Sequence, residues 1–362
     1  MERRSFLKQA SVGMAASAIA APAIAQSSPS VIWRMATSWP KSLDTLYGGA
    51  DLIARRVSEI TDGKFQIRPF AAGEIVPATQ VLDAVQAGTV EIGHTPTYYY
   101  FGKDPAFSFG TSAPFGPNQR QNFAWWHFGG GAEAMAPLLK EYGCVGFPGG
   151  GTGCQMGGWF RKEIKTVEDL KGLKFRVGGM AGLALQKLGV VPQMIAGSDV
   201  YPALEKGTID AAEWVGPHDD EKLGFNKVAK YYYYPGWWEA GPMGMTLINE
   251  KKWASLPKAY QSVLQTASAE ACHWMVAKYD AMNPIALRRL VASGTQLKPF
   301  PKAVLQACEK AVFELYAELM TKSVHWKRIY PGWKKFRDDQ FLWFRVAEAG
   351  YDSYAFTSKI GK

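Results

Sequence analysis

Two stretches of this 362-residue chain follow one pattern, and this repeat constrains the fold more than any other feature. Residues 81–95 read VLDAVQAGTVEIGHT, and residues 200–214 read VYPALEKGTIDAAEW. Each is an amphipathic helix pattern that stops at Gly and continues into a strand with Thr, a β-branched residue and an acid. A second pair, VIWRMA at 31–36 and LKFRVG at 173–178, recurs in the same order. The repeat predicts an α/β fold with two similar lobes.

The order of helix and strand patterns divides the chain further. We expect the first lobe at residues 31–150 and the second at 151–250. Long helical patterns fill 251–325, and 326–362 form a C-terminal helix and tail. The individual strands are expected at 31–39, 64–70, 151–160, 173–177 and 231–249, and the longer helices at 45–61, 256–295 and 302–324.

Residues 1–25 have the features of a signal peptide. Arg3 and Arg4 precede an apolar stretch of small residues that ends in Ala-Ile-Ala, which predicts cleavage before Gln26. The paired arginines indicate the twin-arginine export route, and an ordinary secretory signal is the alternative. No later stretch has the 18 apolar residues of a membrane helix. The mature protein is therefore expected to be soluble and periplasmic.

The charge pattern narrows the class of partner. The formal net charge is +9, but the Lys and Arg residues are dispersed, without a basic run or a nucleic-acid-binding motif. This pattern excludes a nucleic-acid partner and suits a small anion or an anionic membrane surface.

The chain has four cysteines, which the expected export would place in the oxidising periplasm. Cys144 and Cys154 flank the Gly-rich stretch CVGFPGGGTGC and could form a disulfide. Cys272 and Cys308 lie in helical patterns, where free or buried thiols are expected. Because no Cys-x-x-Cys occurs, a structural zinc or redox site is not expected.

The C-terminal helix is apolar on more than one face. It is expected to start near Pro331, and residues at helical spacing and their neighbours form its apolar surface: Trp333, Phe336, Phe341, Leu342, Trp343, Phe344, Ala347, Tyr351 and Tyr354. Such a helix must bury both faces, either under the protein's own lobes or against a second subunit. The pattern leaves these two alternatives open.

The two repeated strands end in polar residues. One ends at His94-Thr95 and the other at Glu213-Trp214. Since ligands bind beyond the carboxyl ends of strands in open α/β lobes, two facing lobes would place these ends in one cleft. Glu213 would then point into a pocket beside a Trp214 wall. The alternative is a solvated strand end next to a core tryptophan.

Three further residues could complete such a pocket. Arg176 ends the strand LKFRV and offers a two-pronged donor for a carboxylate, although a surface ion pair is an alternative role. Gln155 begins another strand, and Glu239 lies in GWWEAGP. Two carboxylates and an amide oxygen are ligands for Na⁺ or Ca²⁺. Without a cation, Glu213 and Glu239 would repel an anion.

The stretch HTPTYYYFGK follows the first repeated strand. Tyr99 or Tyr100 could donate a hydroxyl to a ligand, and a core or hinge cluster is the alternative. HDDE at 218–221 is interpreted as a polar loop or a helix start. The chain has no G-x-S-x-G, H-E-x-x-H or P-loop motif, so known enzyme signatures are lacking.

Together these segments resemble the solute-binding subunits of TRAP (tripartite ATP-independent periplasmic) transporters. The resemblance covers residues 31–356 and is carried by LKGLKFRVGG, the helix-Gly-Thr-Ile-Asp unit and PAFSFGTSAPFG. It implies two α/β lobes of the periplasmic binding protein type, with a hinge, a helix crossing both lobes and a long C-terminal helix. The lobes would close around an organic acid and deliver it to membrane permease subunits, without catalysis. The family's characteristic Arg matches Arg176.

The residues after the Gly-x-x-Asp unit point to one branch of that family. Many dicarboxylate- and sialic-acid-binding members have Asn there, whereas this chain has Glu213-Trp214. It is similar in this to the branch that binds 2-oxo or 2-hydroxy monocarboxylates, such as pyruvate or lactate, through a metal ion. The similarity implies that Gln155, Glu213 and the Trp214 carbonyl hold Na⁺ or Ca²⁺, with Glu239 nearby. Arg176 would take the carboxylate, and Trp214 and the tyrosines would limit ligand size.

The same branch implies a homodimer that exchanges the C-terminal helix. Three alternatives stay open at this point. One is a C4-dicarboxylate or sugar-acid binder of the same family. The others are a periplasmic enzyme exported by the twin-arginine route and a sensor domain that presents its ligand to a signalling partner.

Overall fold

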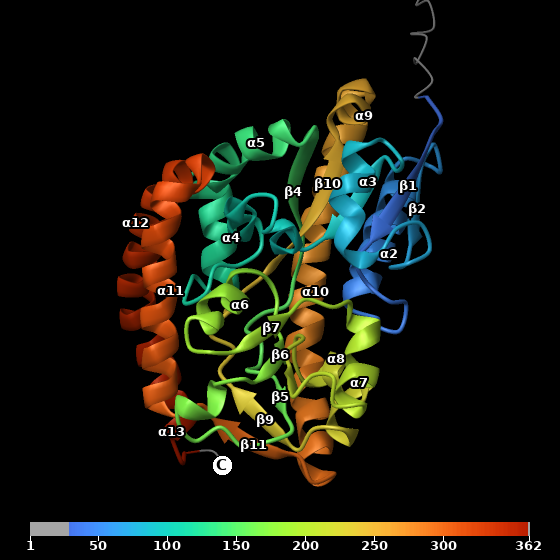
Figure 1. Cartoon of the computed structure of the whole chain (residues 1–362). Coiled ribbons are helices and arrows are strands. Elements are labelled where there is room, and N and C mark those ends of the chain that lie inside the picture. The colour runs from blue at the N-terminus through green and yellow to red at the C-terminus, as the bar shows by residue number, and fades with distance from the viewer. Residues whose placement is uncertain (1–28, 361–362) are drawn as a thin grey trace, which may run out of the picture.

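A computed structural model describes residues 29–360, and the predicted signal peptide lies outside this range. The described chain forms two sheets, one above the other in Figure 1, with helices packed around both. No described helix is both long enough and apolar enough to cross a membrane.

The first sheet has the strand order β2-β1-β3-β10-β4. Its strands are β1 (Val31–Thr37), β2 (Phe65–Phe70), β3 (Ile92–Thr95), β4 (Cys144–Gly151) and β10 (Met243–Asn249). β1 runs parallel to β2 and β3, and β10 runs antiparallel to β3 and β4. In β1 the buried Trp33 and Met35 alternate with the exposed Arg34, so one face of the strand packs into the core.

The second sheet has the order β11-β9-β5-β8-β6-β7. Its strands are β5 (Trp159–Phe160), β6 (Lys174–Arg176), β7 (Val191–Gln193), β8 (Ala211–Ala212), β9 (Tyr231–Tyr234) and β11 (Gln296–Pro299). β6 is parallel to β7 and β8, while β5 is antiparallel to β8 and β9.

The repeat predicted from the sequence corresponds to equivalent units in the two sheets. In the first, α3 (Val81–Gln86) leads into β3, which pairs in parallel with β1. In the second, α7 (Gly197–Glu205) leads into β8, which pairs in parallel with β6. Parallel pairing brings the carboxyl ends of the paired strands to one edge of each sheet. The prediction of a two-lobe α/β fold is confirmed.

The expected strand 231–249 is wrong as a single element. The chain leaves the second sheet at the end of β9, passes through Pro235 and Gly236, and enters the first sheet as β10. Proline has no N–H to donate to a sheet, which favours an end to β9 at this point. The range 151–250 expected for the second lobe therefore includes a strand of the first sheet.

Helix α10 (Lys258–Ala292) runs along both sheets (Figure 1). Over its 35 residues it packs on α2 (Leu46–Ile60) and β4 at one end and on α8 (Pro217–Leu223) at the other. The remaining helices are α4 (Gln119–Phe128), α5 (Gly131–Glu141), α6 (Gly179–Gln186), α9 (Glu250–Ser255) and α11 (Lys302–Lys322), with 3₁₀ turns at Ala78–Gln80, Thr97–Tyr100, Pro105–Gly110, Glu168–Leu170 and Phe225–Lys227.

The C-terminal helix begins earlier than expected. α12 (Val324–Val346) starts after Ser323, whose side chain caps it by accepting from the Trp326 N–H at 3.0 Å. Pro331 thus lies within the helix, and the start expected near this residue is wrong. Trp326 and Trp333 are buried against the body, while the end of α12 and α13 (Glu348–Thr357) carry exposed apolar side chains.

The suggested disulfide is absent. Cys144, Cys154, Cys272 and Cys308 are all free thiols. Cys144 begins β4 and Cys154 follows its end, and an extended strand rises about 3.3 Å per residue. The two Cα atoms are therefore much farther apart than the ~7 Å limit for a disulfide.

Candidate ligand-binding site

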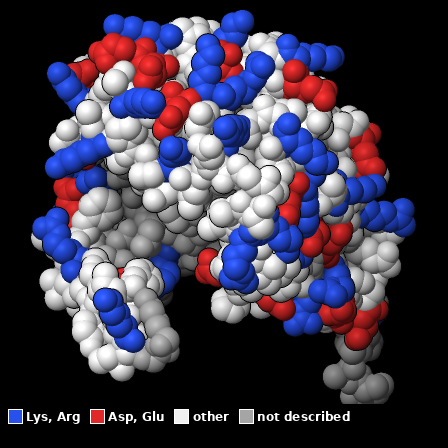
Figure 2. Space-filling model, turned by 90° about the horizontal axis from the view of Figure 1, so that it is seen from below, with Lys and Arg blue, Asp and Glu red and all other residues white. Residues whose placement is uncertain are grey.

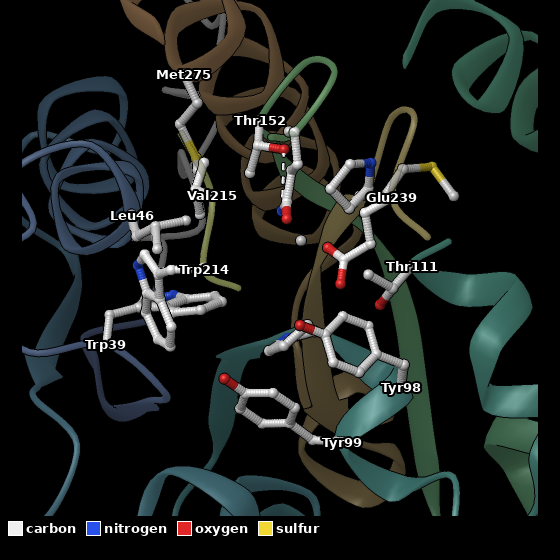
Figure 3. Close-up of a pocket in the computed structure, with 16 residues that line it drawn as sticks. Trp39, Leu46, Tyr98, Tyr99, Thr111, Thr152, Trp214, Val215, Glu239 and Met275 are labelled. Atoms are coloured by element: carbon white, nitrogen blue, oxygen red, sulfur yellow. Dashed lines mark hydrogen bonds between the residues drawn. The ribbon is translucent and has the colours of Figure 1, made fainter. Parts of the chain in front are cut away.

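A small cavity of about 30 Å³ lies between the two sheets (Figure 3). Its walls come from both lobes and from the helix that spans them. Trp39 follows β1, Trp214 follows β8, and Met275 projects from α10. These three side chains also belong to one buried apolar cluster, so the cavity is part of the packing that joins the lobes.

Beneath the Trp214 wall lies a buried ion pair. Arg176 ends β6, and its Nη1 donates to the Glu213 carboxylate and, at 2.8 Å, to the Glu213 carbonyl oxygen. Its Nε donates to the Ile195 carbonyl at 3.2 Å, and both members of the pair are 1% exposed. The guanidinium lies 4.9 Å from the Trp214 ring centroid. Arg176 and Glu213 therefore form an ion pair just behind the cavity wall, whereas the sequence analysis placed Glu213 in the pocket and Arg176 on the ligand.

Two atoms of this ion pair have no hydrogen-bond partner among the described residues. They are Arg176 Nη2 and Glu213 Oε2, and both are buried. The other Glu213 oxygen accepts from the Gly178 N–H at 3.1 Å. Buried polar atoms are nearly always paired, so one free donor and one free acceptor together indicate a polar ligand.

Gln155 and Glu239 lie on two connected loops at the cavity. The Gln155 N–H donates to the Glu239 carbonyl at 3.1 Å, which fixes the two loops together. Both side chains line the cavity and are 5% exposed. Gln155 Oε1 is buried and has no hydrogen-bond partner within residues 29–360. In Figure 3 the Glu239 carboxylate points toward Tyr98.

Burial and like charge act on the two acids together. Burial raises the pKa of Glu213, although Arg176 opposes this shift. Burial and the nearby Glu213 carboxylate raise the pKa of Glu239 well above its usual value. Burial alone would lower the pKa of Arg176, but Glu213 and its neighbours raise it, so the guanidinium stays charged. A positive ion would favour the ionised form of both carboxylates.

The oxygen atoms here fit a hard cation. Glu213 Oε2 and Gln155 Oε1 are unpaired, and the Glu239 carboxylate is beside them at the cavity. In residues 29–360 no group of three or more His, Cys, Asp or Glu side chains could hold a metal ion. Carboxylate and amide oxygens without nitrogen or sulfur suit Na⁺ or Ca²⁺ and not zinc or copper.

The structure places one of the two candidate tyrosines at the cavity. Tyr99 lines the cavity, and so does Tyr98, which the sequence did not single out. Tyr100 does not: its hydroxyl contacts Thr95 Oγ1 at 2.9 Å and accepts from the Leu82 N–H at 3.0 Å. Adjacent residues of a 3₁₀ turn are about 120° apart, so three successive side chains cannot all face one cavity. Tyr100 is therefore a core residue.

Both cavity tyrosines are hydroxyl donors. Burial raises the pKa of Tyr99 to about 12 and that of Tyr98 well above its ordinary value. Tyr98 also shows how closely the lobes approach, because a Cβ added to Gly178 would lie 2.5 Å from its ring. A first-lobe tyrosine thus packs directly on the second lobe at the start of α6.

The structure adds cavity residues that sequence reasoning missed. Trp39 lies beyond the carboxyl end of β1, and Thr152 lies beyond the end of β4. The signal for Trp39 was its place after a strand parallel to the repeated one. The HDDE stretch does begin a helix, α8, but Asp219 and Asp220 are fully buried and not solvated. Three side chains donate to these carboxylates: Tyr279, Tyr232 and Trp159.

Two α/β lobes with a cavity between them, joined by one long helix, define a two-lobe solute-binding protein. The chain belongs to the bacterial extracellular solute-binding protein family 7 (DctP), whose family model matches residues 35–323. It is therefore a solute-binding protein of the TRAP type and not an enzyme.

Two solved structures and one curated protein are similar over nearly the whole chain. A monocarboxylate 2-oxoacid-binding periplasmic protein of Nostoc sp. is 50% identical over 365 residues, covering 99% of this chain and 100% of that protein. A TRAP solute-binding protein from Bordetella bronchiseptica has a TM-score of 0.90 and 55% identity, covering 91% of this chain and 98% of that chain. It is a mixed-occupancy dimer, with copurified calcium and picolinate in one site and an apo second site.

A third relative, from Pseudoalteromonas atlantica, binds sodium and pyruvate. Its TM-score is 0.86 and its identity 38%, covering 89% of this chain and 98% of that chain.

Proposed function

We propose that this protein captures a small 2-oxo or 2-hydroxy monocarboxylate, such as pyruvate or lactate, in the periplasm and delivers it to a TRAP permease. The observation that carries the proposal is a set of buried polar atoms without a partner among the described residues: Gln155 Oε1 at the cavity, and Arg176 Nη2 and Glu213 Oε2 just behind its wall. One donor and two acceptors suit an anion bound together with a cation. The ligands of the Nostoc, Bordetella and Pseudoalteromonas relatives support this chemistry.

The cation would be held by Glu213, Gln155, Glu239 and the Trp214 carbonyl. It supplies a positive charge that binds the carboxylate and the 2-oxo or 2-hydroxy oxygen of the ligand. Arg176 would take the same carboxylate from the other side, and Tyr99 would donate its hydroxyl. Two carboxylates and one monocarboxylate ligand against one guanidinium leave two negative charges, which a divalent ion neutralises. We therefore propose Ca²⁺ as the preferred ion, with Na⁺ as the weaker alternative.

The cavity walls would limit the size of the acid. Trp39 and Trp214 lie together on one side in Figure 3, and Tyr98 closes the other side. A Cβ on Gly197 would lie 2.3 Å from the Trp214 ring, so the indole is packed tightly and cannot swing away from the cavity.

A thermal-unfolding screen tests the proposed function. We expect pyruvate or lactate with Ca²⁺ to stabilise the purified mature protein by about 2.7 kcal/mol at a ligand concentration 100 times the dissociation constant. Chelation of Ca²⁺ in sodium-free buffer should remove this stabilisation. Succinate and sialic acid serve as controls. Stabilisation by succinate alone, unaffected by metal, would instead support a dicarboxylate binder and overturn the proposal.

We also propose that the protein is a homodimer formed through its C-terminal helices. Leu342, Trp343 and Val346 of α12 are 62%, 58% and 76% exposed, and Tyr351 and Tyr354 of α13 are similarly open. Figure 2 shows an arm that projects beside a hollow on the left of the molecule, the side on which α12 lies in Figure 1. Exposed apolar surface of this extent favours a protein partner, and the Bordetella relative is a dimer.

The substitutions L342E and V346E together should convert the dimer to a monomer, because they place two charges in the proposed interface. Sedimentation velocity over a range of protein concentrations measures the result. K335Q, at a 78% exposed side chain of the same helix, is the matched control and should leave the dimer intact. A wild-type protein that sediments as a monomer at every concentration would refute the interface.

Export by the twin-arginine route is proposed from Arg3 and Arg4. Replacing both by Lys should stop export through that route, while an ordinary secretory signal would tolerate the change.

A further inference from the structure

His94 lies at the centre of the site's supporting structure without lining the cavity. It is in β3, is fully buried, and uses both ring nitrogens. Nδ1 accepts from the Trp39 indole N–H at 2.7 Å, and Nε2 lies 2.9 Å from the Gly149 carbonyl oxygen. An indole nitrogen is only a donor and a carbonyl oxygen only an acceptor, so Nε2 carries the proton and the imidazole is neutral.

Surrounding groups keep the ring in this state. Burial lowers the pKa of His94 to about 4, and no acid is among the groups that shift it. The ring is therefore neutral throughout the ordinary pH range. Its orientation is fixed as well, because a flipped ring would bring a ring carbon opposite each partner.

The two hydrogen bonds connect opposite parts of the cavity. Trp39 is one wall. Gly149 lies in β4, just before Gly151 and Thr152, which line the cavity from another side and lead to Gln155. A Cβ on Gly150 would lie 2.7 Å from the Met275 sulfur and 3.5 Å from His94 Nε2, so the glycines of β4 allow this close approach.

We propose that His94 is a positioning residue for ligand selectivity: its imidazole fixes the Trp39 indole relative to the end of β4 and so sets the cavity width. The inference rests on the proposed function, and it adds a selectivity determinant that does not touch the ligand. Without the imidazole, the Trp39 indole N–H loses the one acceptor that it has within residues 29–360, so its side-chain torsion angles are less restrained. The cavity would then accept a bulkier acid more readily relative to pyruvate.

The test compares selectivity and not affinity alone. Dissociation constants for pyruvate and for 3-methyl-2-oxobutanoate are measured by calorimetry at saturating Ca²⁺. In H94F, which fills the space without either hydrogen bond, we expect the ratio of the two constants to shift at least tenfold toward the larger acid. H94Q, whose amide offers one acceptor and one donor, should restore most of the wild-type ratio.

T246V is the matched control. Thr246 pairs with His94 in the sheet register, and its hydroxyl lies 3.2 Å from the Ser268 hydroxyl in the buried core. Thr246 packs beside Gly149, and the variant removes a buried hydrogen bond of the same sheet while leaving both hydrogen bonds of the His94 ring in place. It should lower the unfolding temperature but leave the selectivity ratio unchanged.

If H94F does not fold, H94N replaces it, because its shorter amide keeps polar atoms but cannot reach both partners. A variant that folds and binds with the wild-type ratio would refute the role of His94 alone. Failure of the wild-type protein to bind either acid would refute the proposed function, and the selectivity role with it.

Discussion

Replacing Arg176 by Met is expected to abolish ligand binding and to lower the free energy of unfolding by about 3–5 kcal/mol. Arg176 and Glu213 form a fully buried ion pair, so the substitution leaves the Glu213 carboxylate without its positive partner. It also removes the Nη2 donor that we assign to the ligand carboxylate. Calorimetry with pyruvate and Ca²⁺, and chemical unfolding at neutral pH, measure the two effects separately.

The double variant R176M/E213Q separates stability from binding. Neutralising both members removes the buried unpaired charge, so most of the lost stability should return. Binding should not return, because both the guanidinium and one negative charge of the proposed cation site are gone. Near-normal affinity in folded R176M would show that Arg176 has a structural role alone.

Replacing Glu239 by Gln is expected to lower the affinity for Ca²⁺ on the order of 100-fold, because calcium affinity depends strongly on the number of ligand charges. The affinity for Na⁺ should fall less, since Glu213 and the ligand carboxylate would then balance the charges of Na⁺ and Arg176. Ligand-free stability should not fall, because burial and Glu213 already raise the pKa of Glu239 and disfavour its charge. Calcium titration of the metal-free protein at fixed pyruvate and ionic strength measures the change.

E314Q is the control for this experiment. Glu314 lies on α11 with a 52% exposed side chain and makes only a 3.9 Å contact with Lys310. The substitution makes the same chemical change at the protein surface. The E314Q variant should therefore bind calcium with the affinity of the wild-type protein. An E239Q protein with unchanged calcium affinity would remove Glu239 from the proposed cation site.

The sequence located part of the site from strand ends: Trp214 lines the cavity, whereas Arg176, Glu213 and His94 lie outside its lining. Arg176 and Glu213 come together because β6 and β8 are parallel neighbours, so their carboxyl ends share an edge. The helix-Gly-strand repeat can be recognised in the sequence alone. Parallel pairing of the repeated strands then places their carboxyl ends at the same edge of the sheet. Gln155 and Glu239 also line the predicted cleft.

Features that depend on long-range pairing or on local turns were not accessible in the same way. Whether β10 joins the first or the second sheet is decided by β3 and β4, which are distant in sequence. The choice between Tyr98 and Tyr100 depends on the phase of a single 3₁₀ turn. Hydrophobic periodicity contains neither kind of information.

The path of the chain between the sheets has a consequence for folding cooperativity. The chain leaves the first sheet after β4, returns with β10, and reaches the second sheet again through α10 and β11. Neither half is a continuous segment, so no single cut of the backbone yields an autonomous folding unit. The two halves must acquire their structure together and lose it together. The free energy of binding a ligand in the cavity between the sheets therefore stabilises the whole chain against unfolding and proteolysis.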